Sequence, residues 1–343
     1  MTGEDDAPVT ESDDEAVTFD AIQPRFAALR RALGEVIVGQ DRAVQALLLA
    51  LLCRGHVLIV GVPGLAKTLL VRTLAQATGL PFQRIQFTPD MMPADVTGSQ
   101  MLQHDPTTGQ RRLELMKGPI FAQLVLADEI NRSPPKTQAA LLEAMAERQV
   151  TVAGQTLRLD DPFLVVATQN PIEQAGTYPL PEAQLDRFMF SVPMDYPDKS
   201  EEKRVVTESP AKAEATLSPL TDAGALRAFA DAVAHMPIAD SVVDYAVSLA
   251  RATRPDDESA PDMVRHYVAW GAGPRAAQAL AAGGKALAAL ENEPTPGCNH
   301  IRTVAPMVLR HRLVLSYTAT GERLSADHIV DAVLSHVVEA NPA

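Results

Sequence analysis

Residues 57–68 read Val-Leu-Ile-Val-Gly-Val-Pro-Gly-Leu-Ala-Lys-Thr, and residues 124–129 read Leu-Val-Leu-Ala-Asp-Glu. Each segment begins as an unbroken apolar run, which is typical of a strand buried on both faces of a sheet. The first run leads into a glycine-containing loop and then into a helical pattern over residues 68–77, which Gly79 would end. The second run ends in two adjacent carboxylates. These two segments predict a strand–loop–helix unit within a parallel sheet.

Other segments extend this pattern. Further β-rich runs occur at residues 82–87, 163–168 and 188–192, and a helical pattern with an apolar stripe covers residues 136–148. Strands that alternate with helices in this way predict a parallel five-stranded sheet between helices, hence the α/β class. Two segments interrupt the alternation, around residues 104–112 and 149–159. In the first, Pro106 and Gly109 lie between stretches that could pair; in the second, apolar residues alternate around Ala153-Gly154-Gln155. Both segments are predicted to be hairpins.

The composition changes after Pro193, where alanine-rich helical patterns replace the strands. We therefore expect an α/β domain over residues 18–197 and a smaller all-helical domain over residues 198–343. Residues 1–20 contain eight acids and no lysine or arginine, and they contribute −8 to the net charge of −13. Runs of like charge usually stay unfolded, so residues 1–17 are predicted to be a solvated acidic tail.

The loop at residues 61–68 has the composition of a phosphate site. A glycine-rich loop that opens a helix directs several backbone N–H groups and the positive end of the helix dipole toward an anion. Lys67 would supply a positive charge for the β- and γ-phosphates, and Thr68 a hydroxyl for Mg²⁺. The usual pattern has glycine directly before the lysine; alanine fits if its φ is negative, so we expect a negative φ at Ala66. A plain turn between strand and helix is the alternative for this segment alone.

Asp128 and Glu129 make that alternative a poor one. Two carboxylates at the end of a buried strand are costly unless something there requires them. After a phosphate loop, the first would hold the Mg²⁺ shell and the second would polarise the attacking water. The sequence thus predicts binding of a nucleoside triphosphate with Mg²⁺. It contains no Asn-Lys-x-Asp segment of the kind that reads guanine, which favours ATP.

The bulk composition excludes several other classes. No apolar run approaches the roughly 18 to 20 residues that a membrane helix needs, and the N-terminus is acidic where a secretory signal would be basic. Cys53 and Cys298 offer no disulfide framework, and no residue near Cys298 and His300 completes a four-ligand zinc set. We therefore expect a cytoplasmic protein. The acidic balance also disfavours an autonomous nucleic-acid binder.

With these residues in place, the chain from about residue 20 onward resembles the MoxR family of AAA+ ATPases, in the clade with an insert in helix 2. The blocks that carry the resemblance are Gly61–Thr68, Gln86–Asp90, Asp95–Gly98, Asp128–Arg132, Pro135–Gln138, Ala167–Pro171, Pro181–Phe188 and Gly273–Ala276. In addition, Val38-Gly39-Gln40-Asp41 resembles the adenine-side segment of AAA+ ATPases.

The resemblance implies roles for single residues. Asn170 is similar to sensor 1, which positions the water, although a polar strand end is an equally good interpretation. Arg187 is similar to the arginine finger that reaches a neighbouring subunit, with Arg132 as a second candidate and a salt bridge to Glu182 or Asp186 as the alternative. Arg275 is similar to sensor 2, or is an exposed helix arginine. The expected nucleotide contacts are Val38, Gly39, Gly61, Val62, Pro63, Gly64, Leu65, Ala66, Lys67, Thr68, Leu69 and Asp128.

A finger that acts in trans implies assembly, and the resemblance implies a homo-oligomeric ring, most often a hexamer. It also implies a partner with a von Willebrand factor A domain and a chaperone-like role in maturing or activating a client complex. The two predicted hairpins are similar to elements that face the pore or a client in this clade. For residues 310–312 (Arg-His-Arg) no role can be derived, and a polar packing contact is the expectation.

Two other functions remain open at this point. A DNA-associated motor of the same clade would show hydrolysis stimulated by DNA with strong salt dependence. A nucleotide-gated scaffold would bind ATP with little turnover, which the intact Asp128 and Glu129 disfavour.

Overall fold

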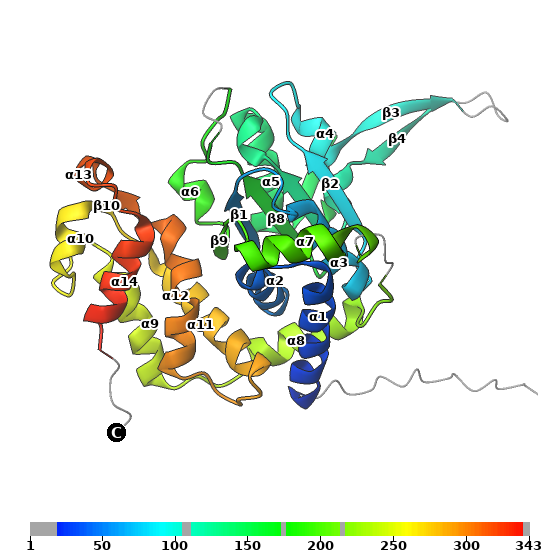
Figure 1. Ribbon diagram of the computed structural model, residues 1–343. Coiled ribbons are helices and arrows are strands. Elements are labelled where there is room, and N and C mark those ends of the chain that lie inside the picture. Colours follow the sequence, from blue (N-terminus) through cyan, green and yellow to red (C-terminus); the bar gives the residue numbers. More distant parts are fainter. Residues whose placement is uncertain (1–18, 105–110, 173–175, 213–216, 339–343) are drawn as a thin grey trace, which may run out of the picture.

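The computed structural model describes residues 19–104, 111–172, 176–212 and 217–338, so the predicted tail lies outside the described residues. A five-stranded sheet in the order β2-β5-β8-β1-β9 forms its centre (Figure 1). The strands are β1 (Val57–Gly61), β2 (Phe82–Gln86), β5 (Leu124–Asp128), β8 (Leu164–Gln169) and β9 (Phe190–Met194). Every neighbouring pair runs parallel. The five predicted strands are confirmed, with their ends shifted by one or two residues.

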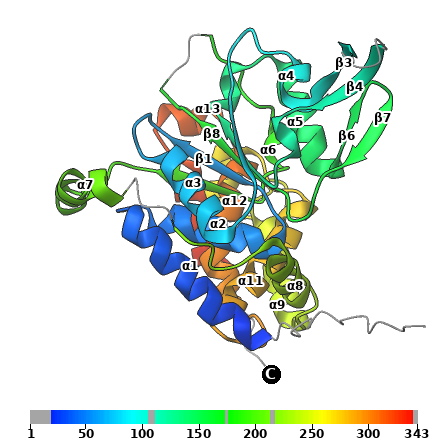
Figure 2. The ribbon, with the colours of Figure 1, turned by 90° about the vertical axis from the view of Figure 1, so that its right-hand side faces the viewer.

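Helices cover both faces of the sheet because alternate strand residues point to opposite sides. Val57 and Ile59 enter one apolar cluster with helices α1 (Ile22–Val36), α2 (Asp41–Cys53) and α3 (Lys67–Thr78). Leu58 enters a second cluster with α4 (Pro93–Thr97) and α5 (Pro135–Glu147). Figure 2 shows these two helical layers on either side of the strands. The predicted helices over residues 68–77 and 136–148 correspond to α3 and α5.

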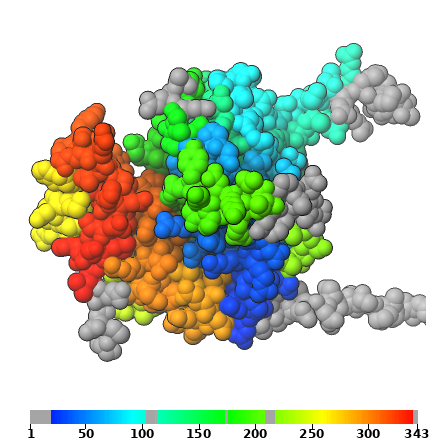
Figure 3. All heavy atoms as spheres, in the orientation of Figure 1, coloured from blue at the N-terminus to red at the C-terminus, as the bar shows by residue number. Residues whose placement is uncertain are grey.

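Both predicted hairpins are present. Strands β3 (Gly98–His104) and β4 (Arg111–Lys117) pair antiparallel, as do β6 (Gln149–Val152) and β7 (Gln155–Arg158). The β3–β4 hairpin projects away from the body of the molecule (Figures 1 and 3). Its predicted turn residues, Pro106 and Gly109, lie outside the described residues.

Among the described residues after β9, the regular structure is helical, as predicted, apart from one short antiparallel pairing between β10 (Val268–Trp270) and β11 (Val314–Leu315). The helices are α7 (Lys199–Lys212), α8 (Ala223–Ala234), α9 (Asp240–Ala252), α10 (Asp262–Tyr267), α11 (Pro274–Leu290), α12 (Cys298–Leu309), α13 (Tyr317–Gly321) and α14 (Ala326–His336). The shorter helical turns are η1 (Phe19–Ala21), η2 (Pro119–Phe121), η3 (Ile130–Arg132), η4 (Arg310–Arg312) and α6 (Glu182–Leu185). No helix in these described ranges is long and apolar enough to cross a bilayer.

One apolar cluster continues from the sheet into the C-terminal helices, because α2 packs against both α8 and α11. The domain boundary near residue 197 therefore stays a prediction from composition, since the core itself has no break there.

The Arg-His-Arg segment at η4 forms a polar contact inside this assembly. The Arg312 side chain is buried; its Nε lies 2.8 Å from Asp186 Oδ1, and its Nη2 donates to the Phe188 carbonyl at 2.8 Å. Arg310 pairs with Asp327 and donates to the Ser191 carbonyl. The segment thus ties the C-terminal helices to the residues that lead into β9, which confirms the expectation of a polar packing contact.

Two histidines, the buried His56 and the half-buried His311, make stability depend on pH. His56 accepts a hydrogen bond from the Val165 N–H at Nδ1, and its Nε2 lies 3.3 Å from the Met145 carbonyl, so the ring is neutral. Burial, reinforced by Arg148, lowers the pKa of His56 to about 3. Burial likewise lowers the pKa of His311 well below its ordinary value. In both cases the unfolded chain binds the proton more tightly than the folded chain does.

Stability is therefore expected to be fully present above pH 6.5 and to fall as pH drops toward 3. By pH 5 the loss amounts to about 2 kcal/mol for His56, because each pKa unit corresponds to about 1.4 kcal/mol. Thermal or urea unfolding of the wild type, His56→Gln and the exposed control His235→Gln between pH 7.5 and 5 tests this. The loss of unfolding free energy between pH 7.5 and 5 should be smaller in His56→Gln than in the wild type and in His235→Gln. An equal loss in His56→Gln would contradict the low pKa of His56.

Candidate nucleotide site

The phosphate loop connects the end of β1 to the start of α3. Gly64 has φ +88, a conformation that favours glycine. At Gly61 the requirement is different: a Cβ there would lie 2.7 Å from the carbonyl oxygen of Met194 on β9. The glycine at position 61 therefore permits close contact between two strands, in addition to any approach of a phosphate.

Ala66 does not have the expected negative φ. Its φ and ψ are +58 and +21, in the left-handed region, and it immediately precedes the first residue of α3. The reason is that the loop must turn sharply to present its N–H groups at the helix start, whichever residue stands there. An alanine in this conformation costs on the order of 1 kcal/mol.

The two carboxylates lie at the end of β5, held by different partners. Asp128 is buried; its Oδ1 accepts from the Thr168 hydroxyl at 2.6 Å, and its Oδ2 lies 2.7 Å from Arg84 Nη2. Glu129 has φ +55, and its backbone N–H donates to the same Thr168 hydroxyl oxygen at 2.8 Å. Such a conformation in a glutamate is strained and persists only where the surroundings fix it. Thr168 on β8 thus orients both acids.

Lys67 and the two acids line one cleft of ≈ 500 Å³ at the carboxyl end of the sheet, where ligands bind in open α/β folds. Lys67 is buried, and its Nζ donates to the Gly61 carbonyl at 2.5 Å. Burial lowers the pKa of Lys67, while Asp128 and Glu129 act to raise it. The cleft therefore combines backbone donors, one ammonium and two carboxylates.

The donors fit a magnesium ion with a bound phosphate. Thr68 and Asp128 both line the cleft and offer a hydroxyl and a carboxylate, the oxygen ligands that Mg²⁺ prefers. Both Asp128 oxygens already have hydrogen-bond partners. Asp128 would therefore contact Mg²⁺ through a water molecule, or its ion pair with Arg84 would have to break before it could bind the ion directly.

Asn170 and the adenine-side segment lie near this cleft. Asn170 is buried just after β8, the strand between β5 and β1, and its Oδ1 accepts from the Ile172 N–H at 3.1 Å. Val38 and Gly39 lie between α1 and α2, where Gly39 has φ +73 and faces the Glu201 carboxylate of α7. The adjoining Gln40 side chain donates to the Asp195 carbonyl at 3.1 Å. This segment is thereby tied to the end of β9.

Arg187 lies at the other end of the sheet from the phosphate loop. Strand β9 runs parallel to β1 with Phe190 opposite Val57, so Arg187 lies where β1 begins, whereas the loop follows Gly61. At about 3.3 Å per residue, the strand separates these ends by roughly 13 Å. The Arg187 guanidinium donates to the Leu142 carbonyl at 2.5 Å; it forms no salt bridge with Glu182 or Asp186.

Arg275 lies at the same end as Arg187. It follows Pro274 at the start of α11, and its Nη1 lies 3.5 Å from Asp186 Oδ2, with 65% of its side chain exposed. The described residues that line the phosphate cleft all fall between Pro63 and Glu129, so neither Arg187 nor Arg275 is among them. In contrast, Arg132 lies beside the cleft, with its Nη1 3.1 Å from Glu129 Oε2.

Sequence reasoning missed several side chains that organise the site. On β2, Arg84 binds Asp128 and Gln86 binds Glu129. Thr168 contacts both acids. Asp186 forms ion pairs with Arg275 and Arg312. A signal existed for the first two: Arg84 and Gln86 alternate around the buried Ile85, so both point to one face of an edge strand.

The fold and the cleft together define a P-loop ATPase of the AAA+ class. Residues 56–190 match the family model described as the ATPase family associated with various cellular activities, and residues 261–333 match the AAA lid domain. The chain is 42% identical to the chaperone MoxR1 of Mycobacterium tuberculosis over 90% of this chain and 81% of that protein. It is 31% identical to the protein MoxR of Paracoccus denitrificans, covering 85% and 89% of the two chains.

The crystal structure of a Cytophaga hutchinsonii protein classed with the ATPases superposes with a TM-score of 0.86 at 38% identity, over 94% of this chain and 97% of that one. The chain belongs to the MoxR family of AAA+ ATPases, and ATP hydrolysis is its activity.

Proposed function

We propose that this ATPase works with Mg²⁺ as a closed ring of six copies and uses ATP to remodel a client protein complex. The observation that carries the ring is the separation of the arginines from the cleft. Arg187 and Arg275 lie at the opposite end of the sheet from the phosphate loop of their own chain. A head-to-tail contact would bring them to the loop of the next copy, and such contacts close into rings.

Within each cleft, different residues of the chain bind the phosphates and activate the water. The loop N–H groups and Lys67 bind the β- and γ-phosphates, and bound Mg²⁺ would neutralise the charge that develops there. Glu129 polarises the attacking water as a general base, and Asn170, just after the neighbouring strand β8, supplies a second polar contact. Glu129 first has to turn from Gln86 and Arg132, which both donate to its Oε2.

The β3–β4 hairpin supports a protein client. Leu102 and Leu113 lie opposite each other on one face of the hairpin and are both exposed, as are Met101 and Met116 on the other face. Exposed apolar side chains that form a contiguous patch commonly mark protein interaction sites. They favour a protein surface over nucleic acid, for which a basic patch would be required.

A partner with a von Willebrand factor A domain completes the proposal, as the family resemblance implies. The name of the Mycobacterium tuberculosis relative, a chaperone, agrees with the remodelling role. If DNA instead raised the hydrolysis rate with a steep salt dependence, the DNA-associated motor would replace this proposal.

The ring is tested by measuring the ATPase rate per chain against protein concentration, with and without Mg²⁺, alongside the mass from light scattering. We expect the rate per chain to rise as a ring-sized species appears, and to vanish when Mg²⁺ is chelated. A rate that stays flat with concentration while the protein remains monomeric would exclude active sites shared between copies.

A further inference from the structure

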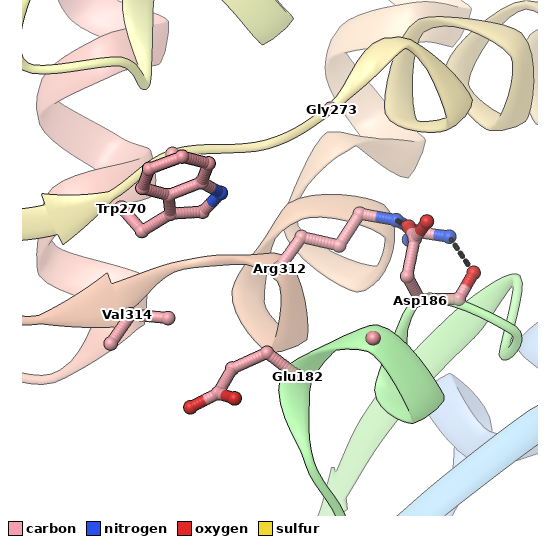
Figure 4. A pocket seen from close by; sticks show the side chains of 8 residues that line it. Glu182, Asp186, Trp270, Gly273, Arg312 and Val314 are labelled. Atoms are coloured by element: carbon pink, nitrogen blue, oxygen red, sulfur yellow. Dashed lines mark hydrogen bonds and ion pairs between the residues drawn. The ribbon is translucent and has the colours of Figure 1, made fainter.

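A cavity of ≈ 530 Å³ lies between α6 and the β10–β11 pair, far along the chain from the phosphate loop. Figure 4 shows its principal side chains: Trp270 on one wall, Glu182 on α6 below it, and Arg312 reaching across to Asp186. Because Asp186 precedes Arg187 and pairs with Arg275, this cavity directly adjoins both arginines that we place at the neighbouring copy's phosphates. Any copy that receives Arg187 must therefore lie close to this cavity.

The chemistry of the cavity fits a cationic side chain. Trp270 is the single tryptophan of the chain and is 72% exposed, an unusual position for the largest aromatic side chain. Glu182, on the same cavity, makes no side-chain hydrogen bond or ion pair with another described residue. An indole and an unpaired carboxylate that line the same cavity can attract one guanidinium by cation–π and ionic interactions together.

The phosphate cleft offers the matching group. Arg72 on α3 lines the cleft and is exposed, and its side chain has no partner among the residues that the structure describes. The other cleft cations are engaged, Arg84 by Asp128 and Lys67 by the Gly61 carbonyl. The cavity with Trp270 and Glu182 thus offers a carboxylate without a partner, and the phosphate cleft offers a guanidinium without one. In the proposed ring, the cavity of one copy would lie close to the cleft of the next.

We propose that the Trp270–Glu182 cavity is a docking pocket for a second copy of this chain, and that it receives Arg72 of that copy. The inference rests on the proposed ring. The contact would lie beside the inserted Arg187 and Arg275 and would fix the distance between the two chains at the reaction centre. It would make Trp270 a direct spectroscopic probe of each interface.

The first test follows tryptophan emission of the full-length chain with Mg²⁺ and a non-hydrolysable ATP analogue, over a concentration range in which light scattering detects assembly. Only Trp270 contributes, so the emission maximum should move to shorter wavelength in step with ring formation. If the wild type never assembles, both the ring and the pocket are overturned. A ring whose Trp270 emission matches that of the monomer overturns the pocket alone.

The second test reverses the charges. Glu182→Arg should raise the concentration for half-assembly by about tenfold or more, while the exposed control Asp244→Arg on α9 should assemble as the wild type does. Adding Arg72→Glu to Glu182→Arg should restore assembly, because the opposite charges again face each other. Circular dichroism verifies that each variant is folded. A double variant that assembles no better than Glu182→Arg alone would show that Arg72 is not the occupant.

Discussion

Replacing Glu129 by glutamine is expected to lower the ATPase rate by about 10²- to 10⁴-fold while ATP binding is retained, because a general base contributes a factor of this size. The geometry supports a specific role: Glu129 has a strained left-handed backbone, fixed by the Thr168 hydroxyl. Glutamine keeps the shape and loses only the negative charge. The chain should therefore trap ATP unhydrolysed.

Measuring kcat together with the nucleotide retained after rapid gel filtration separates these effects. Lys67→Ala should lose bound ATP as well as turnover, since it removes the only ammonium in the described cleft lining. Glu147→Gln, an exposed change at the end of α5, serves as the matched control. Wild-type turnover in Glu129→Gln would mean that another group activates the water.

A mixture of two inactive variants is expected to hydrolyse ATP. Arg187→Ala keeps its phosphate cleft but lacks the finger, whereas Lys67→Ala has no working cleft but keeps Arg187. In a mixed ring, the arginine of a Lys67→Ala chain can reach the cleft of an Arg187→Ala neighbour. Since an arginine finger contributes about 10³- to 10⁵-fold, activity should rise from near zero to a substantial fraction of the wild-type rate.

The experiment titrates one variant into the other at constant total protein and follows phosphate release. Arg132→Ala gives the necessary comparison, because Arg132 lies beside the cleft of its own chain and pairs with Glu129. If Arg132→Ala is inactive and recovers in the mixture, while Arg187→Ala alone hydrolyses ATP normally, the finger is Arg132. If no pair of variants recovers, the arginines do not act between copies.

Much of the architecture could be predicted because its signals are local. A buried parallel strand needs an unbroken apolar run, as at residues 124–127, and a helix start after a glycine loop leaves the same pattern wherever it occurs. The strand ends were displaced by one or two residues because hydrogen bonding to neighbouring strands, absent from the local sequence, sets the last paired residue. The prediction of a negative φ at Ala66 was wrong for a related reason. The turn of the loop determines this φ, against the preference of alanine itself.

The sequence by itself determined the class of the protein, the phosphate loop, the two acids and the nucleotide, because each depends on residue types at fixed short spacing. Only the tertiary structure decided which ends of the sheet the arginines occupy. Asp186 meets Arg275 and Arg312 across long stretches of chain, and the parallel register of β1 and β9 places Arg187 away from its own phosphate loop. Such positions depend on strand order and helix packing, which pair residues that have no fixed spacing in the sequence.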